Sequence, residues 1–251
     1  MLKEMGTLVL LSSVLLTACS SHESQIVTTD TIQPSEEPRI NDQTPVAPAK
    51  LIERSEHGHV KLYAIKEVQR NIEGVTLDIN GQQKDFEWHI PHTGAAGPQV
   101  FYTDLTGDGI EEAIVIINTG RGTGLDLYDI HVINSSDFSE IKVPTYDEVV
   151  AEHISNSVTI IDEQTIDIQI QAKDKQYHFT AKVNLPPDFE QNELGFGGVY
   201  IYFIDNQQIF LTMGASVGIS PQYVATVKAS FEFDQALNEF VVDEIDITQE
   251  N

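Results

Sequence analysis

The stretch FYTDLTGDGIEEAIVIIN, residues 101–118, joins a short acidic loop that carries two glycines to a hydrophobic strand. Its second half, residues 110–118, is an almost continuous apolar run. Such a run is typical of a strand at the centre of a sheet, where both faces are buried. We therefore expect a β-sheet domain that is organised around this strand.

Alternation of apolar and polar residues surrounds the central strand. Residues 75–79 and 86–90 alternate on either side of Asn80-Gly81, a dipeptide that favours a β-hairpin turn. One segment, residues 145–154, has helical spacing, with Asp147 as the expected N-cap. The sequence predicts a mainly β fold, an antiparallel sandwich or meander with one short helix. Further strands are expected at residues 99–102, 125–134, 158–161, 166–170, 177–183, 199–204, 209–213, 224–233 and 240–247.

The N-terminus has the features of a secretion signal. Lys3 supplies a positive charge, and residues 5–16 form an apolar run that is short for a membrane span. The stretch LTAC ends at Cys19, the only cysteine, so no intramolecular disulfide can form. We expect residues 1–18 to be a signal peptide. An ordinary signal peptide or an uncleaved anchor is the alternative.

LTAC resembles the lipobox of bacterial lipoproteins. That resemblance implies cleavage before Cys19 and attachment of acyl chains, such as palmitate, to its sulfur and new amino group. The lipid bilayer would then be a partner of the protein, and the folded domain would lie outside the cytoplasm. Two or three acyl chains anchor a protein stably, whereas a single chain gives marginal binding.

Residues 20–50 are rich in Ser, Thr, Pro, Glu and Gln and contain almost no large apolar side chains. Such a segment cannot bury enough surface to fold. We therefore predict a lipidated cysteine and flexible, disordered linker over residues 19–56. A β-rich extracytoplasmic domain is expected over residues 57–251.

The chain is strongly acidic, with 39 Asp and Glu against 14 Lys and Arg and a formal net charge of −25. Such a charge repels phosphate backbones and anionic lipid headgroups, so nucleic acid is not an expected partner. It suits a cationic envelope component or a basic protein partner. A merely solubilising surface is the alternative interpretation.

The acidic loop places oxygen ligands at the spacing that a calcium ion requires. Calcium loops bind through positions one, three, five and nine and through the carbonyl at position seven. Here these positions are Asp104, Thr106, Asp108, the carbonyl of Ile110, and Glu112. The sequence predicts one calcium ion at these five residues. A surface turn with solvated carboxylates is the alternative.

DLTGDGIEEAIVIIN resembles the calcium loops of FG-GAP and VCBS repeat proteins. Thr106 departs from the Asp or Asn that is usual at its position. Only one copy of the loop occurs, which argues against a propeller or repeat array. DLTGDG, together with the later YDIHVIN, also resembles lipoproteins and secreted proteins of spore-forming bacteria.

Two glycine motifs do not predict catalysis. GASVG, residues 214–218, matches a nucleophile elbow, but no histidine follows Ser216 and the chain lacks α/β alternation. GRGTG, residues 120–124, is followed by neither Gly-Lys-Ser nor a helix. We interpret it as a hairpin connection.

Several histidines invite a metal or catalytic interpretation. The pairs His57 with His59 and His89 with His92 have spacings that a transition metal can use, although solvated histidines are the simpler account. Asp129 and His131 share one face of a predicted strand, but the sequence indicates no third member of a site.

The expected function is that of a membrane-anchored binding or structural module with one calcium-stabilised loop. The alternative is a cell-envelope hydrolase that uses Asp or Glu residues not identifiable from the sequence. No catalytic residue is assigned, and an enzyme is the less expected outcome.

Overall fold

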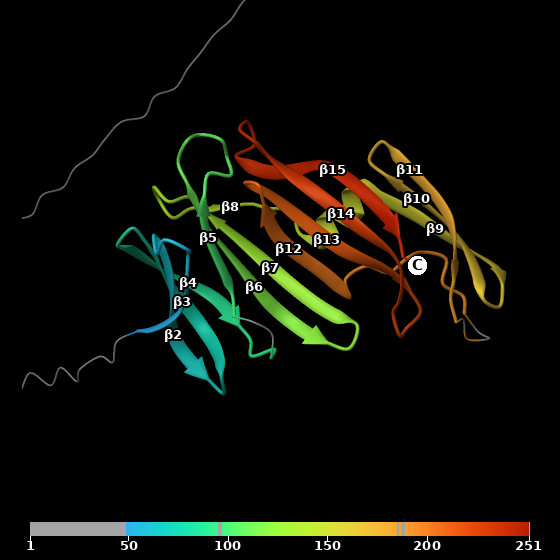
Figure 1. Cartoon of the computed structure of the whole chain (residues 1–251), viewed down its shortest axis with the longest axis horizontal. Coiled ribbons are helices and arrows are strands. Elements are labelled where there is room, and N and C mark those ends of the chain that lie inside the picture. Colours follow the sequence, from blue (N-terminus) through green and yellow to red (C-terminus); the bar gives the residue numbers. More distant parts are fainter. Residues whose placement is uncertain (1–48, 95–96, 185, 187–188, 251) are drawn as a thin grey trace, which may run out of the picture. The chain divides into compact units, whose positions relative to one another are not determined.

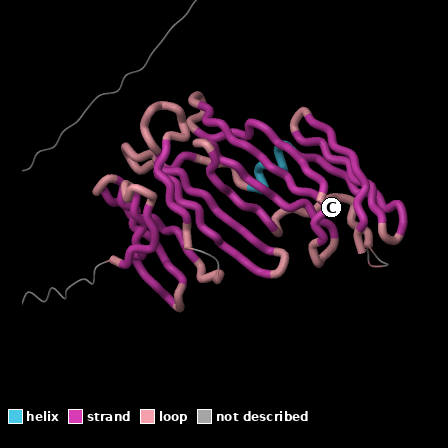
Figure 2. Tube along the Cα trace, viewed as in Figure 1, coloured by secondary structure: helices cyan, strands magenta, loops and turns pink. Residues whose placement is uncertain are grey.

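The structure is a computed structural model that describes residues 49–94, 97–184, 186 and 189–250. Within these ranges the chain forms fifteen strands and one short helix, in agreement with the predicted mainly β fold (Figures 1 and 2). The expected signal peptide, Cys19 and most of the expected linker lie outside the described residues. In the described ranges, no helix has the length and apolar character needed to span a membrane.

The N-terminal sheet is a four-stranded antiparallel meander. Its last two strands form the predicted hairpin, in which Asn80 and Gly81 both have positive φ. The sheet begins earlier than predicted, because KLIER pairs with β2 although it lies inside the expected linker. The strands are β1 (Lys50–Arg54), β2 (Val60–Val68), β3 (Asn71–Ile79) and β4 (Gln82–Ile90).

The largest sheet has eight strands in the order β15-β14-β13-β12-β7-β6-β5, with β8 paired to β7. Every neighbouring pair is antiparallel except β12 and β7, which are parallel. Its strands are β5 (Gln99–Thr103), β6 (Glu112–Gly122), β7 (Leu125–Ile133), β8 (Glu140–Ile141), β12 (Val199–Asp205), β13 (Gln208–Val217), β14 (Gln222–Asp234) and β15 (Glu239–Gln249).

The third sheet contains three antiparallel strands in the order β11-β10-β9. They are β9 (Ile154–Asp162), β10 (Thr165–Ala172) and β11 (Lys175–Lys182).

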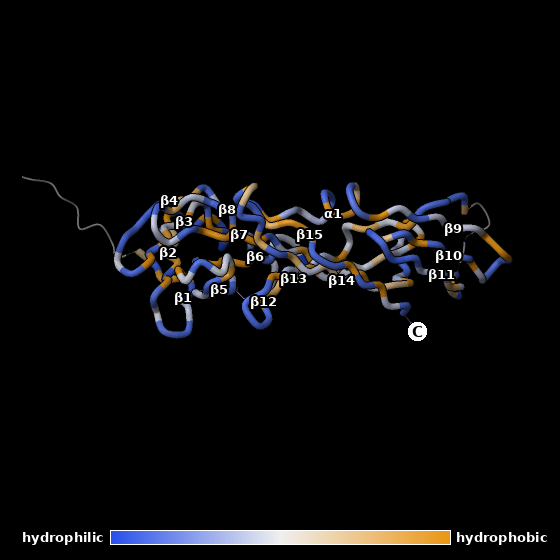
Figure 3. The backbone as a smooth tube through the Cα atoms, turned by 90° about the horizontal axis from the view of Figure 1, so that it is seen from above, coloured by the Kyte–Doolittle hydropathy of each residue, from blue (hydrophilic) through white to orange (hydrophobic). Residues whose placement is uncertain are grey.

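Strand β6 is buried on both faces, as predicted, although it lies next to the edge strand β5 and not at the centre of its sheet. Ala113, Val115 and Ile117 pack into one core with the N-terminal sheet. Ile114 and Ile116 pack into a second core with β13, β14, β15 and the three-stranded sheet. Figure 3 shows hydrophobic stretches within the strands and hydrophilic turns between them. The apolar run is continuous because its successive side chains enter two different cores.

Helix α1 (Tyr146–His153) lies close to the predicted segment, but Asp147 is not its N-cap. Thr145 occupies that position, and it exchanges hydrogen bonds with Glu148 in a capping box. Asp147 lies in the first turn, where a carboxylate also favours the helix dipole.

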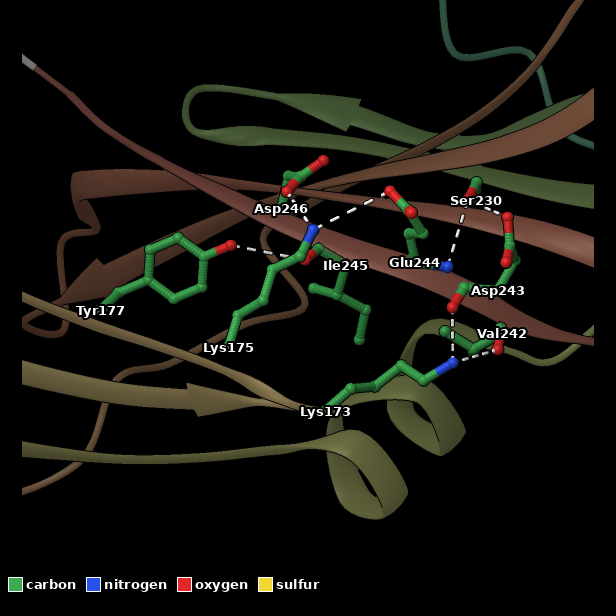
Figure 4. A network of polar contacts seen from close by, with 9 residues as sticks. All are labelled: Lys173, Lys175, Tyr177, Ser230, Val242, Asp243, Glu244, Ile245 and Asp246. Carbon is green, nitrogen blue, oxygen red and sulfur yellow. Dashed lines mark hydrogen bonds and ion pairs between the residues drawn. The ribbon is translucent and has the colours of Figure 1, made fainter.

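A β-bulge in β15 is held by one side chain from β14 and one from the turn between β10 and β11 (Figure 4). Asp243 and Glu244 lie opposite the single residue Ser230. The hydroxyl of Ser230 accepts a hydrogen bond of 3.2 Å from the amide of Glu244. Lys173, between β10 and β11, donates to the carbonyls of Val242, at 2.7 Å, and Asp243. These contacts tie the three-stranded sheet to the edge of the large sheet.

Candidate functional site

A pocket forms where two parallel strands diverge. β7 and β12 pair only at Asp126 with Val199 and at Leu127 with Tyr200. Farther along, β7 pairs with β8, while β12 pairs with β13 alone. A cavity of about 510 Å³, here called the wedge pocket, lies next to this divergence. Its lining residues are Asp129, Ile130, His131, Glu140, Ile141, Lys142, Val143, Thr145, Tyr146, Asp147, Tyr200 and Tyr202.

Three tyrosines give the wedge pocket an aromatic wall. The rings of Tyr146 and Tyr200 stack with centroids 4.2 Å apart and an interplanar angle of 13°. The hydroxyl of Tyr202 donates to the carbonyl of Pro144 at 2.8 Å, which fixes the ring next to the start of α1. The wall therefore consists of packed side chains from β12 and α1.

Three carboxylates also line the wedge pocket. Asp129 comes from β7, Glu140 from β8 and Asp147 from the first turn of α1. The one lysine of the lining, Lys142, forms an ion pair of 2.9 Å with Glu148. The lining thus has three carboxylates and no uncommitted lysine or arginine, so its charge attracts cations.

Burial raises the pKa of Asp129, and His131 opposes this shift by lowering it. Asp129 is nevertheless an exposed residue of β7. Burial also raises the pKa of Tyr200, and the charge of Asp129 adds to that increase. The pKa of Tyr202 is raised by the same two causes, burial first. The hydroxyls of Tyr200 and Tyr202 therefore remain protonated, and that of Tyr202 donates its proton to the carbonyl of Pro144.

The sequence indicated no third member of a site with Asp129 and His131. In the structure Glu140 lies next to His131. Nδ1 of His131 lies 2.6 Å from a carboxylate oxygen of Glu140. One ring face of His131 stacks on Trp88, with centroids 4.0 Å apart and an angle of 14°. Glu140 belongs to a strand of two residues, which is too short for a pattern of alternation. Only the pairing of β8 with β7 brings it to the site.

The acidic loop between β5 and β6 bonds to its own backbone. The two carboxylate oxygens of Asp104 accept hydrogen bonds from the amides of Gly107, at 2.7 Å, and Gly109, at 2.9 Å. Asp108 accepts from the Ile110 amide at 2.8 Å. Both glycines have positive φ, and Ile110 is exposed, so β6 begins two residues later than predicted.

Glu112 closes the loop from the first position of β6. Its side chain is buried, with 1% exposure, and accepts hydrogen bonds from the amides of Leu105, at 2.8 Å, and Thr106, at 3.3 Å. Burial raises the pKa of Glu112, the two amides oppose the shift, and the charges of Asp108 and Asp104 add to it. The hydroxyl of Thr106 lies 3.4 Å from the other carboxylate oxygen.

The five predicted calcium ligands therefore lie in one loop, but their arrangement is that of a self-bonded turn. Among the residues that the structure describes, no three or more His, Cys, Asp or Glu side chains form a metal-binding group. Each carboxylate oxygen can accept more than one hydrogen bond or metal contact, so oxygens already bonded to amides keep free lone pairs. The chemistry of the loop is thus compatible with calcium, which stays a prediction.

The remaining motifs take structural positions. Ser216 lies within β13 and forms a β-bridge with Gly195. Residues 120–124 lie in the β6–β7 hairpin, as predicted. His59 stacks on Tyr102, and its Nδ1 lies 3.0 Å from Oδ1 of Asn80. The ring of His57 lies edge-on to that of His59, with centroids 6.4 Å apart, so the structure brings this predicted pair together.

Comparison of the chain with protein-family models, curated proteins and solved structures finds no match.

Proposed function

We propose that this chain is a lipid-anchored, extracytoplasmic binding module whose wedge pocket takes an organic cation. The observation that carries the proposal is the position of Asp129 beside the stacked pair Tyr146 and Tyr200. Aromatic rings and carboxylates together recognise alkylammonium and guanidinium groups, because the ring covers the apolar part while the carboxylate neutralises the charge. A lysine or arginine side chain of a partner, or an amine of an envelope component, has this chemistry.

The electrostatics of the whole chain support a cationic ligand. The net charge of −25 raises the local concentration of cations near the surface and accelerates their association. Lys142 does not compete for the site, because Glu148 holds its ammonium group. An anionic ligand would meet three carboxylates in the same lining.

The location proposed for the module rests on the sequence. LTAC supports lipid attachment at Cys19, and the polar composition of residues 20–50 supports a linker between the bilayer and the domain. The acidic loop would act as a calcium clip at the entry to β6, through Asp104, Thr106, Asp108, the Ile110 carbonyl and Glu112.

Calorimetric titration of the full chain in detergent tests the binding function. The two probes are Nα-acetyl-lysine methylamide and its norleucine analogue, which shares the four-carbon side chain but lacks the ammonium group. We expect binding of the lysine probe only. Asp129→Asn should weaken it by about tenfold, which corresponds to about 1.4 kcal/mol.

Asp205→Asn is the matched control, because Asp205 is exposed at the end of β12 and is not part of the pocket lining. Equal affinity for the lysine and norleucine probes would contradict the proposal. If Asp129→Asn binds the lysine probe as tightly as the unmodified chain does, the proposal is contradicted as well.

A hydrolase is the second candidate, and one observation favours it. His131, oriented by Glu140 at 2.6 Å, shares the pocket with Asp129, whose pKa is raised. His131 would remove a proton from an attacking water, and Asp129 would protonate the leaving group. Release of p-nitrophenol from p-nitrophenyl esters and glycosides tests this activity, with His131→Gln and Asp129→Asn as inactive variants. If no substrate is cleaved faster by the protein than by these variants, the binding function stands alone.

A further inference from the structure

The turn between β1 and β2 presents two histidines on a fixed backbone. Ser55, with 3% exposure, donates its amide to the carbonyl of Val60 at 2.9 Å, and its hydroxyl accepts from the Val60 amide at 3.1 Å. The carbonyl of Ser55 also accepts a bond of 2.9 Å from the amide of Gly58, whose φ of +73° suits glycine. These bonds hold His57 and His59 on either side of that glycine.

Two neighbours fix the ring of His59. It stacks on Tyr102 with centroids 5.4 Å apart, and its Nδ1 lies 3.0 Å from Oδ1 of Asn80. The amide nitrogen of Asn80 donates to the hydroxyl of Tyr102 at 3.0 Å, so the amide oxygen accepts from His59. Nδ1 of the neutral ring therefore carries the proton, and Nε2 keeps its lone pair for a ligand. Proteins orient metal-binding histidines by a bond of this kind to the second ring nitrogen.

His57 lies at a spacing from His59 that a shared metal ion allows. The two ring centroids are 6.4 Å apart, and the interplanar angle is 79°. An ion bound at about 2.0–2.1 Å lies about 3.2 Å from each imidazole centre, so the two centres are then roughly 5 to 6.4 Å apart. The observed spacing is at the upper end of this range, and the exposed side chain of His57 can turn towards the ion.

A cavity of about 710 Å³ lies beside the two histidines and gives an ion access to them. Its lining includes Glu56 and Glu111, whose charges attract a cation. Among the described residues that line it, there is no lysine or arginine to repel one.

We propose that His57 and His59 together bind a divalent transition metal ion, with Nε2 of His59 as one ligand. Imidazole nitrogen suits Zn²⁺, Ni²⁺ and Cu²⁺, whereas Ca²⁺ and Mg²⁺ prefer oxygen. Water fills the coordination positions that the two histidines leave open. The acidic loop is a different kind of site, because all of its predicted ligands are oxygens.

Calorimetric titration of the full chain in detergent with Ni²⁺ tests the proposal, with Mg²⁺ as the comparison ion. We expect Ni²⁺ to bind and Mg²⁺ to leave its affinity unchanged. His57→Ala and His59→Ala should each weaken Ni²⁺ binding by about tenfold or more. The double variant His89→Ala with His92→Ala is the matched control, because both histidines are exposed and neither lines the cavity.

Asn80→Gly tests the orientation of His59. Glycine adopts the positive φ of Asn80 without strain, so the turn is kept while His59 loses its acceptor. We expect Ni²⁺ affinity to fall by about tenfold, as for other residues that orient a metal-bound histidine. Asn238→Gly is the control, because Asn238 has a φ of +57° in the turn between β14 and β15. Equal affinities of Asn80→Gly and the unmodified chain would contradict this role of Asn80.

Three results would overturn the proposal: no binding of Ni²⁺, the same affinity in His57→Ala and His59→Ala as in the unmodified chain, or an equal loss of affinity in the control variant of His89 and His92. Melting temperatures show whether each variant is folded. His57→Ala keeps the test valid if His59→Ala is destabilised by losing its contact with Tyr102, because the side chain of His57 is exposed. Asp108→Asn should retain Ni²⁺ binding, which separates this site from the predicted calcium loop.

Discussion

The carboxylate of Glu112, at the start of β6, accepts a hydrogen bond of 2.8 Å from the amide of Leu105, seven residues earlier. This bond closes the acidic loop over a buried charge. Burial raises the pKa of Glu112 above its ordinary value, while the amides of Leu105 and Thr106 oppose that increase. The loop therefore stores electrostatic repulsion, which a proton or a cation would relieve.

Stability should fall as pH rises through the folded-state pKa of Glu112. Above the unfolded value of 4.5, the folded state holds a proton that the unfolded state has lost. The unfolded state then binds fewer protons, so the free energy of unfolding decreases with pH in this window. Glu112→Gln should remove this component of the slope. Urea titrations at a series of pH values measure it, with Glu111→Gln, an exposed neighbour, as the control.

Calcium should stabilise the domain if the loop binds it. Extracellular calcium modules bind with dissociation constants of about 0.1 to 1 mM. At 1 mM calcium the expected gain is about 0.4 to 1.4 kcal/mol, or about 1 to 5 °C in melting temperature. Asp108→Asn should abolish the response, and Asp205→Asn should retain it. The readout is the calcium-dependent shift, because replacing Asp104 would also disturb the two glycine amides.

Gly197→Ala should damage the aromatic wall of the wedge pocket. Gly197 has a φ of +82°, and a Cβ there would lie 3.1 Å from the hydroxyl of Tyr146. The backbone strain costs about 1 to 3 kcal/mol, and the contact displaces Tyr146 from Tyr200. Gly58→Ala is a matched control, with a φ of +73° and open space around the new methyl group. Both variants should lose stability to urea, but only Gly197→Ala should lose affinity for the lysine probe.

Lys173→Met should loosen the attachment of the three-stranded sheet. The ammonium group of Lys173 satisfies the carbonyls of Val242 and Asp243 at the β15 bulge. Its loss should lower the free energy of unfolding, measured by urea titration, by only about 1 kcal/mol, because the two carbonyls are partly accessible to water. Lys182→Met, on the exposed side of β11, should change stability by less than half as much. Equal effects of the two variants would show that Lys173 contributes only its surface charge.

Cys19→Ala should release the protein from membranes. The unmodified chain should incorporate labelled palmitate at Cys19. It should also sediment with the membrane fraction, because two or three acyl chains anchor a protein stably. The variant should incorporate no label and remain in the supernatant after high-speed centrifugation. Membrane association of Cys19→Ala at the level of the unmodified chain would contradict lipid anchoring.

The sequence by itself determined the mainly β fold, the hairpin at Asn80-Gly81 and the burial of β6 on both faces. These features depend on local patterns: alternation, a turn dipeptide and a continuous apolar run. Local patterns were insufficient at β1 and β8, because β1 lies in a segment of linker-like composition and β8 has only two residues. Strand β2 was not predicted either, although Val60 and Leu62 alternate there with Lys61 and Tyr63. The N-cap was misassigned because Thr145 and Asp147 both have side chains that can cap a helix.

Only the tertiary structure decided where the candidate sites lie. The wedge pocket depends on the parallel contact between Leu127 and Tyr200, which are far apart in the chain, and on the return of Glu140 to His131. The outer face of the three-stranded sheet likewise depends on the register of three strands and on which of their faces is buried. Register and strand divergence arise from long-range pairing, and a pattern within one segment does not encode its partner.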